Sequence, residues 1–146
     1  MLEKFKKEMI TAMKERDKVK LNTLRAVKGA MQLEVINNKK EESDELLLDV
    51  INKQIKMRND SIEEFEKAGR DDLVNSYKSE IDILEEYMPK KLSEDEINEI
   101  LDLGISESGA SGVRDLGSVM RIVTPKVKNR CDMKVVTGML RDKLSK

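Results

Sequence analysis

At 146 residues and 16.7 kDa, the chain is long enough to fold as one domain or as a small pair of domains without a disulfide or a metal. It has no histidine and one cysteine, so it lacks the commonest general base and cannot form an internal disulfide. Charged residues make up 39% of the chain and aromatic residues 3%, which favours helices over a β-sheet core. Because no apolar run approaches a membrane span and the first thirty residues are charged throughout, we expect a soluble, cytoplasmic protein without a membrane partner.

Charge is unevenly distributed along the chain, although the formal net charge is only −1. Residues 1–40 carry eleven basic and five acidic side chains, whereas residues 41–100 carry eight basic and nineteen acidic ones. Residues 121–146 are basic again, with eight basic side chains against Asp132 and Asp142. A pI near 5.7 argues against indiscriminate binding of nucleic acid, but the basic end of the chain permits a local patch that faces phosphates.

Four helices are predicted in the first ninety residues, from apolar side chains that recur every three or four positions. The expected helices cover about residues 2–15, 17–37, 43–68 and 70–88. Asp17 and either Ser43 or Asp44 are suitable N-caps, and Gly69 suits the left-handed position that follows a helix. We expect Pro89 to end the fourth helix, because the residue before a proline is pushed out of helical geometry.

Three further helices are predicted in the rest of the chain. They cover about residues 93–105, 113–124 and 132–144. Ser93 and Glu96 form a capping box pattern at the start of the first of them. Pro125 is expected to stop or kink the second, and Asp132 is a suitable N-cap for the third.

Glycines punctuate this second half of the chain. Residues 109–112 form a predicted turn, Gly104 costs its helix about 1 kcal/mol against alanine, and Gly117 is expected to let a neighbouring helix approach closely. No segment has the pattern of a strand. We therefore predict an all-α fold, with a helical N-terminal domain of about four helices at 1–90 and a small three-helix domain at 91–146.

Several spaced motifs resemble those of a known family. In the first half they are Leu24-Arg25, Arg58-Asn59-Asp60-Ser61-Ile62-Glu63-Glu64-Phe65, Lys67-Ala68-Gly69-Arg70-Asp71-Asp72-Leu73, Glu80-Ile81 and Leu84-Glu85-Glu86-Tyr87-Met88-Pro89. In the second half they are Ser108-Gly109-Ala110-Ser111, Asp115-Leu116-Gly117, Val119-Met120 and Pro125-Lys126-Val127-Lys128. Together they cover essentially the whole chain and resemble the GatB/YqeY family, and the second set resembles the tail of the B subunit of the tRNA-dependent amidotransferase.

This resemblance implies a helical N-terminal domain and a small three-helix domain, the latter a counterpart of the amidotransferase segment that touches tRNA. It also brings the label of a carbon–nitrogen ligase with glutamine as amido-nitrogen donor. In one turn the chain departs from the family pattern Gly-Arg-Ala-Asp, since it reads Asn129-Arg130-Cys131-Asp132. Asparagine tolerates the left-handed conformation better than most residues, so we expect the turn to be kept.

The ligase label does not carry over to this chain alone. Release of ammonia from glutamine needs an activated nucleophile, and activation of a carboxylate by ATP needs groups that bind phosphate and magnesium. The sequence has no glycine-rich phosphate loop and no histidine, and in the amidotransferase that the tail resembles these tasks belong to another subunit and domain. We therefore predict no catalytic residue, no metal site and no cofactor.

Two features of the sequence have both a chemical and a plainer interpretation. Cys131 lies near Lys128, Arg130 and Lys134, which would favour a reactive thiolate, but it also stands where the family pattern has alanine, and we favour a small packed side chain. The acidic pairs are Glu63-Glu64, Asp71-Asp72 and Glu85-Glu86. Neighbours in a helix point about 100° apart, so we interpret these pairs as solvated helix faces and not as magnesium ligands.

Five polar residues of the motif region are candidates for either a structural or a binding role. They are Arg58, Asp60, Ser61, Arg70 and Asp72. In the structural interpretation, Arg58 or Arg70 pairs with an acid across the helical hairpin and fixes its angle near Gly69. In the other, the residues form a binding surface.

The candidate nucleic-acid-binding residues are the cations near the C-terminus. They are Arg121, Lys126, Lys128, Arg130 and Lys134, four of them within nine residues. Their charges can neutralise phosphates, and amides at the start of the last helix would add an anion site. No aromatic side chain lies nearby in sequence, so we expect recognition of the backbone and shape of structured RNA. The alternative is a solvated basic face that contacts the acidic middle of the same chain.

The leading hypothesis is a non-catalytic helical adaptor whose C-terminal domain binds tRNA, alongside a synthetase or an amidotransferase. The first alternative is a component of a glutamine-using carbon–nitrogen ligase, which the resemblance implies. The second is a protein–protein interaction module that uses the acidic third and fourth helices without RNA.

Overall fold

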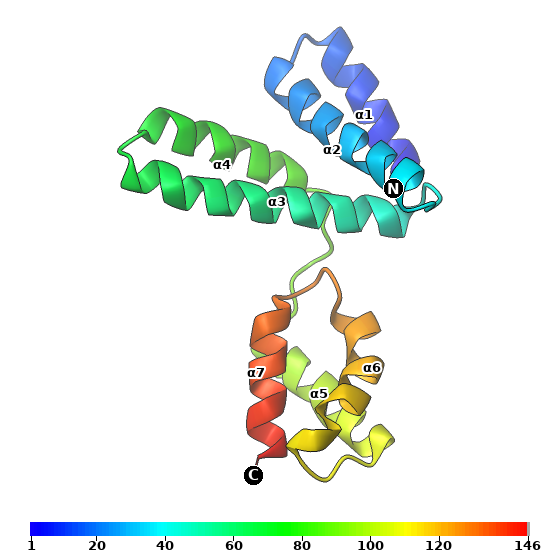
Figure 1. The fold of residues 1–146 in the computed structure, drawn as a ribbon. Coiled ribbons are helices and arrows are strands. Elements are labelled where there is room, and N and C mark those ends of the chain that lie inside the picture. Colours follow the sequence, from blue (N-terminus) through cyan, green and yellow to red (C-terminus); the bar gives the residue numbers. More distant parts are fainter. Residues whose placement is uncertain (146) are drawn as a thin grey trace. The chain divides into compact units, whose positions relative to one another are not determined.

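The computed structural model describes residues 1–145 and divides the chain into two compact units, Met1–Met88 and Pro89–Lys146 (Figure 1). The first unit contains α1 (Leu2–Lys14), α2 (Lys18–Asn37), α3 (Asp44–Lys67) and α4 (Asp71–Glu85). The second contains α5 (Glu94–Ser108), the short 3-10 helix η1 (Val113–Asp115), α6 (Leu116–Val127) and α7 (Met133–Leu144). The described residues contain no strand, so the predicted all-α fold is confirmed. None of these helices combines the length and the apolar character needed to cross a membrane.

Side-chain caps fix where four of the helices begin. Asp17, Ser43, Ser93 and Asp132 each accept a hydrogen bond, at 2.9–3.2 Å, from a backbone N–H in the first turn of the helix that follows. Each bond satisfies a donor that the helix itself leaves unpaired. The predicted N-caps, including the capping box at Ser93, are therefore confirmed. Gly69 follows α3 with a φ of 71°, the left-handed conformation expected there.

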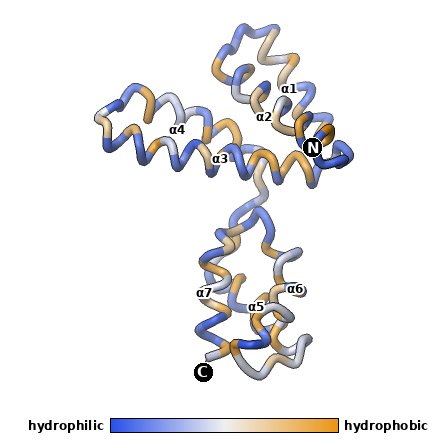
Figure 2. Tube along the Cα trace, viewed as in Figure 1, coloured by the Kyte–Doolittle hydropathy of each residue, from blue (hydrophilic) through white to orange (hydrophobic). Residues whose placement is uncertain are grey.

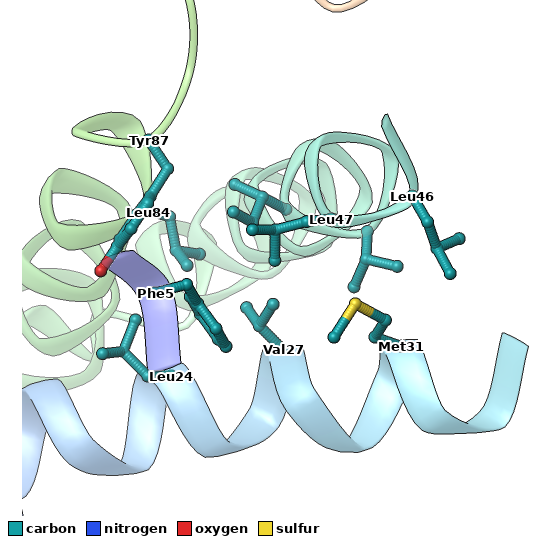
Figure 3. Close-up of a cluster of buried hydrophobic side chains, with 10 residues drawn as sticks. Phe5, Leu24, Val27, Met31, Leu46, Leu47, Leu84 and Tyr87 are labelled. Carbon is teal, nitrogen blue, oxygen red and sulfur yellow. The ribbon is translucent and has the colours of Figure 1, made fainter. Parts of the chain in front are cut away.

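Two helical hairpins, α1–α2 and α3–α4, form the first unit (Figure 1). Apolar and polar residues alternate along these helices, as Figure 2 shows, so that each buries one side. The main core consists of Phe5, Leu24, Val27, Met31, Leu46, Leu47, Val50, Ile51, Leu84 and Tyr87. Figure 3 shows side chains from α1 and α2 directed toward those of α3 and toward Leu84 and Tyr87. A smaller cluster of Ile62, Val74 and Ile81 holds α3 against α4.

The end of α4 differs from the prediction that Pro89 stops it at Met88. The helix ends at Glu85, and the next residues form a turn closed by bonds from the N–H of Tyr87 to Leu84 O and of Met88 to Glu85 O. Tyr87 is 4% exposed, its ring meets Phe5 edge-on at 5.6 Å, and its hydroxyl donates to the carboxylate of Glu8. Burying this side chain turns the backbone before the proline is reached.

The second unit has its own core of eight buried apolar residues from α5, α6 and α7. They are Ile97, Leu101, Val119, Val123, Val127, Val136, Leu140 and Leu144. Gly104 of α5 lies against α6, since a Cβ added to it would come within 2.7 Å of Val123 Cγ2. A Cβ on Gly117 would meet nothing within 4 Å. The expected close approach at Gly117 is therefore wrong, and it occurs at Gly104 instead.

Pro125 does not stop α6, contrary to one of the two outcomes predicted for it. The helix continues to Val127, and the N–H of Lys128 still bonds to Thr124 O at 2.9 Å. Val127 is completely buried in the core of the second unit. Burial of this side chain offsets the hydrogen bond that proline cannot donate.

Candidate nucleic-acid interface

The turn between α6 and α7 holds most of the candidate cations in a defined backbone. Asn129 has a φ of 63°, the left-handed conformation expected of it. The N–H of Arg130 donates to Val127 O at 3.0 Å, and its carbonyl accepts the N–H of Leu92 at 2.9 Å. The last bond ties the turn to the segment just before α5, so the turn has a fixed place in the second unit.

The five predicted cations do not share one environment. Arg121, Lys126, Lys128 and Lys134 are exposed, whereas Arg130 is partly buried and its Nε lies away from solvent without a hydrogen-bond partner among residues 1–145. Lys126, Lys128 and Lys134 lie around the turn, and Arg121 lies about 7 Å farther back along α6. Arg130 is therefore less accessible to a phosphate than the other four cations.

Arg130 faces the acidic first turn of α5. The pKa of Glu96 lies below its ordinary value, mainly because its carboxylate accepts hydrogen bonds from Ser93, and the charges of Arg130 and Lys90 lower it further. The charge of Arg130 thus acts on the acidic middle of the chain, and we expect it to help hold the turn against α5.

The anion site expected at the start of α7 is wrong. The Oδ1 atom of Asp132 accepts the N–H of Lys134 at 2.9 Å and so occupies the position that a phosphate oxygen would take. A phosphate placed there would also meet the negative charge of this carboxylate. Any binding of phosphate by this region depends on side-chain cations and not on the helix start.

Three cations that were not predicted lie in the same region of the second unit. Lys90 and Lys91 are exposed and directly precede Leu92, which is bonded to the α6–α7 turn. Arg141 lies two turns after Lys134 on α7, and the two flank a shallow surface hollow that also includes Met133, Thr137 and Gly138. The seven-residue spacing on a helix could have indicated Arg141, but no sequence signal places Lys90 beside a turn that is forty residues away.

Cys131 has the packed environment favoured from the sequence. Its thiol is directed to Val127 O at 3.5 Å. Burial raises the pKa of the Cys131 thiol and the charge of Asp132 raises it further, while Arg130 opposes them. The thiolate is therefore disfavoured at neutral pH, and nothing in this environment activates the sulfur as a nucleophile.

Arg58 has the structural role that was one of its two predicted interpretations. Its Nε lies 3.7 Å from Glu80 Oε2 across the α3–α4 hairpin, and its Nη1 donates to the side-chain oxygen of Gln54 at 2.7 Å. The side chain of Arg58 is only 12% exposed. Arg58 therefore joins α3 to α4, although at a distance from Gly69 along both helices.

The other four motif residues do not converge with Arg58. Arg70 forms a two-pronged bond with Asp72, with both N–O distances 3.2 Å. This bond raises the pKa of Arg70 and lowers the pKa of Asp72. Asp60 is exposed on α3 and Ser61 is partly buried. Nowhere in residues 1–145 do three or more acidic or cysteine side chains gather in a way that would hold a metal ion.

Comparison with known proteins agrees with the motifs. The sequence pattern of the Yqey-like protein family matches residues 2–144. The chain belongs to this family. The match does not show the resemblance of the second half of the chain to the tail of the amidotransferase B subunit.

The curated relatives include proteins named "Altered inheritance of mitochondria protein 41, mitochondrial". The one from Pyrenophora tritici-repentis is 35% identical over 88% of this chain and 72% of its own length. Those from Kluyveromyces lactis and Lachancea thermotolerans are 40% and 37% identical over 57% and 58% of this chain. The matches span less than half of these two yeast proteins, at 45% and 46% of their length.

The names of these relatives contradict the cytoplasmic location expected from the sequence, because they are mitochondrial proteins. The expectation rested on charge and on the lack of an apolar segment. Proteins of the mitochondrial interior share both properties with cytoplasmic ones, so neither property separates the two locations.

Proposed function

We propose that this protein is a non-catalytic helical adaptor that binds the backbone of structured RNA, with tRNA as the target, through its second unit. The observation that carries the proposal is the set of exposed cations around the α6–α7 turn. They are Lys90, Lys91, Lys126, Lys128, Lys134 and Arg141. The resemblance of residues 108–128 to the tail of the amidotransferase B subunit supports tRNA as the target and a synthetase or amidotransferase as the companion.

The kind of RNA follows from what the cations can contact. Lysine and arginine bind phosphates without reading sequence, and the second unit has no aromatic side chain on which an unpaired base could stack. The hollow flanked by Lys134 and Arg141 can receive a row of backbone phosphates between two positive charges. A folded RNA holds its backbone phosphates at fixed spacing, whereas a flexible single strand does not.

The test is the binding of labelled, unfractionated tRNA to the full chain at increasing salt. Affinity should fall steeply with salt, since each neutralised phosphate releases counterions. Reversal of Lys126, Lys134 and Arg141 to glutamate should lower the affinity at least about tenfold. The matched control reverses Lys56, Lys67 and Lys78, which are exposed in the first unit and give the same change in net charge.

Equal losses in the two triple variants would show that total charge, and not this surface, binds the RNA. Absence of salt-dependent binding at low ionic strength would falsify the proposal. The adaptor role also excludes a bond-making step by this chain alone. Turnover of glutamine by the purified protein, abolished by a point substitution, would therefore overturn it in favour of the ligase alternative.

A further inference from the structure

A stripe of five exposed apolar or small residues, interrupted by Asn22, lies on the outer face of α2, opposite the face that packs into the core. Its members recur at alternating steps of three and four residues: Val19, Asn22, Ala26, Gly29, Leu33 and Ile36. All of them are exposed, and Val19, Leu33 and Ile36 are 51%, 59% and 73% exposed. Because the inward face of α2 is also apolar, this helix is unlike a surface helix with one polar side.

The spacing indicates that a helix would cover the stripe. Steps of three and four are those of the inward positions in a coiled coil, which place side chains along one seam of a partner helix. The stripe is about 25 Å long, or nearly five helical turns. At the middle of the stripe, Ala26 has only a methyl group and Gly29 has no side chain, and a Cβ on Gly29 would meet nothing within 4 Å. A partner helix can therefore approach the backbone of α2 closely.

The charges beside the stripe indicate what kind of helix fits. Lys18, Arg25 and Gln32 each directly precede a stripe residue, at the position that flanks the seam of a coiled coil. Lys18 and Arg25 are exposed, and neither is paired with an acid in the described part of the chain. A matching helix would bear aspartate or glutamate at its own flanking positions.

A second copy of this chain does not meet these requirements. If two α2 helices paired along this stripe, the flanking positions of the second copy would be Lys18, Arg25 and Gln32 on one side and Thr23 and Ala30 on the other, and none of them is acidic. The acidic helices α3, α4 and α5 cannot substitute, because their only exposed large apolar side chains among the described residues are Met57 and Leu103. We propose that α2 docks an amphipathic helix of another protein, with an apolar seam flanked by acidic residues. The stripe belongs to the first unit and the cations of the proposed RNA interface belong to the second, and neither proposal depends on the other.

The test uses a fluorescent peptide of three heptads, with leucine at the seam and glutamate at the flanking positions, and a matched peptide with lysine in place of glutamate. The glutamate peptide should bind the full-length chain in a saturable manner, at least about tenfold more tightly than the lysine peptide. Leu33→Glu combined with Ile36→Glu should weaken binding at least about tenfold. Lys18→Glu combined with Arg25→Glu should reverse the preference between the two peptides.

The control variant is Leu103→Glu, which replaces a leucine of similar exposure on the second unit and should leave peptide binding unchanged. Helix content by circular dichroism checks that each variant is folded. No binding of the glutamate peptide at about 0.1 mM, or equal binding by the Leu33→Glu, Ile36→Glu variant, would overturn the proposal. A concentration-dependent dimer of the chain that Leu33→Glu dissociates would also overturn it, in favour of a second copy as the occupant.

Discussion

Arg58 and Glu80 form an ion pair that connects α3 and α4, with Nε and Oε2 3.7 Å apart and side chains only 12% and 19% exposed. Neither of these two atoms has a hydrogen-bond partner in the described structure, so the pair relies on charge attraction and on the bond from Arg58 to Gln54. Two charges that are mostly removed from water stabilise a protein little as a pair, but loss of one leaves the other without compensation. The pair therefore fixes how the two helices face each other.

We expect Arg58→Met to lower the free energy of unfolding by about 1–3 kcal/mol, because Glu80 is left buried and unpaired. The double variant Arg58→Met, Glu80→Leu should recover most of this loss. Unfolding in urea can be followed by tyrosine fluorescence, since both tyrosines, Tyr77 and Tyr87, lie in the first unit. If the effects of the two substitutions simply add, the pair is not coupled.

The exposed pair of Arg70 and Asp72 provides the control for this experiment. Its side chains are 57% and 68% exposed, although its bond is two-pronged. Exposed pairs contribute little because water and salt screen them, so Arg70→Met should change the free energy of unfolding by no more than about 0.5 kcal/mol. A larger effect would indicate that the turn after Gly69 depends on this bond.

Gly104→Ala should destabilise the second unit by about 1–3 kcal/mol, even though alanine is the better helix former. The new methyl group would meet Val123 Cγ2 at 2.7 Å, and Val123 is branched and completely buried, so it cannot move aside easily. Gly138→Ala is the control in α7, because its Cβ would meet nothing within 4 Å and should stabilise the helix by up to about 1 kcal/mol. Thermal unfolding by circular dichroism measures both. A stabilised Gly104→Ala variant would show that α5 and α6 are less closely packed.

The features that were predictable from the sequence are local ones. The N-caps at Asp17, Ser43 and Asp132 depend on one side chain and the three residues after it, and the left-handed turn at Asn129 depends on one residue. The N-caps and the left-handed turn can therefore both be predicted from a few consecutive residues, without knowledge of tertiary contacts. Helix positions follow in the same way from the spacing of apolar side chains.

The features that were missed depend on which elements meet in space. Gly104 and Gly117 are equivalent as sequence signals, and only the packing of α5 on α6 distinguishes them. Arg130 was grouped with its basic neighbours, but it is partly buried and its charge acts on Glu96 of α5, whereas Lys126, Lys128 and Lys134 are exposed. The bond from the N–H of Leu92 to the Arg130 carbonyl brings Lys90 into the candidate interface, which no pattern of spacing could predict.

Acid should destabilise the second unit partly through Glu96. The pKa of Glu96 is held below its ordinary value of 4.5, mainly by the hydrogen bonds from Ser93. A carboxylate with a lowered pKa stabilises the folded state above pH 4.5, and this contribution is lost as the pH falls through the folded pKa. Glu96→Gln should therefore lower the melting temperature at neutral pH and reduce its further fall in acid. The measurement is thermal unfolding by circular dichroism at neutral and acidic pH. An acid dependence identical to that of the wild type would show that the capping box does not contribute to it.

Lys126 and Arg130 differ in burial, and this difference predicts opposite effects of the same substitution. Lys126 is exposed, so Lys126→Met should reduce the slope of log affinity for tRNA against log salt by about one and leave the melting temperature unchanged. Arg130→Met removes a partly buried side chain whose charge acts on Glu96, so it should cost about 1 kcal/mol of stability and change the slope less. Salt titrations of tRNA binding, paired with thermal melts, separate the two effects. A loss of slope in Arg130→Met equal to that in Lys126→Met, without loss of stability, would show that Arg130 contacts RNA and does not hold the turn.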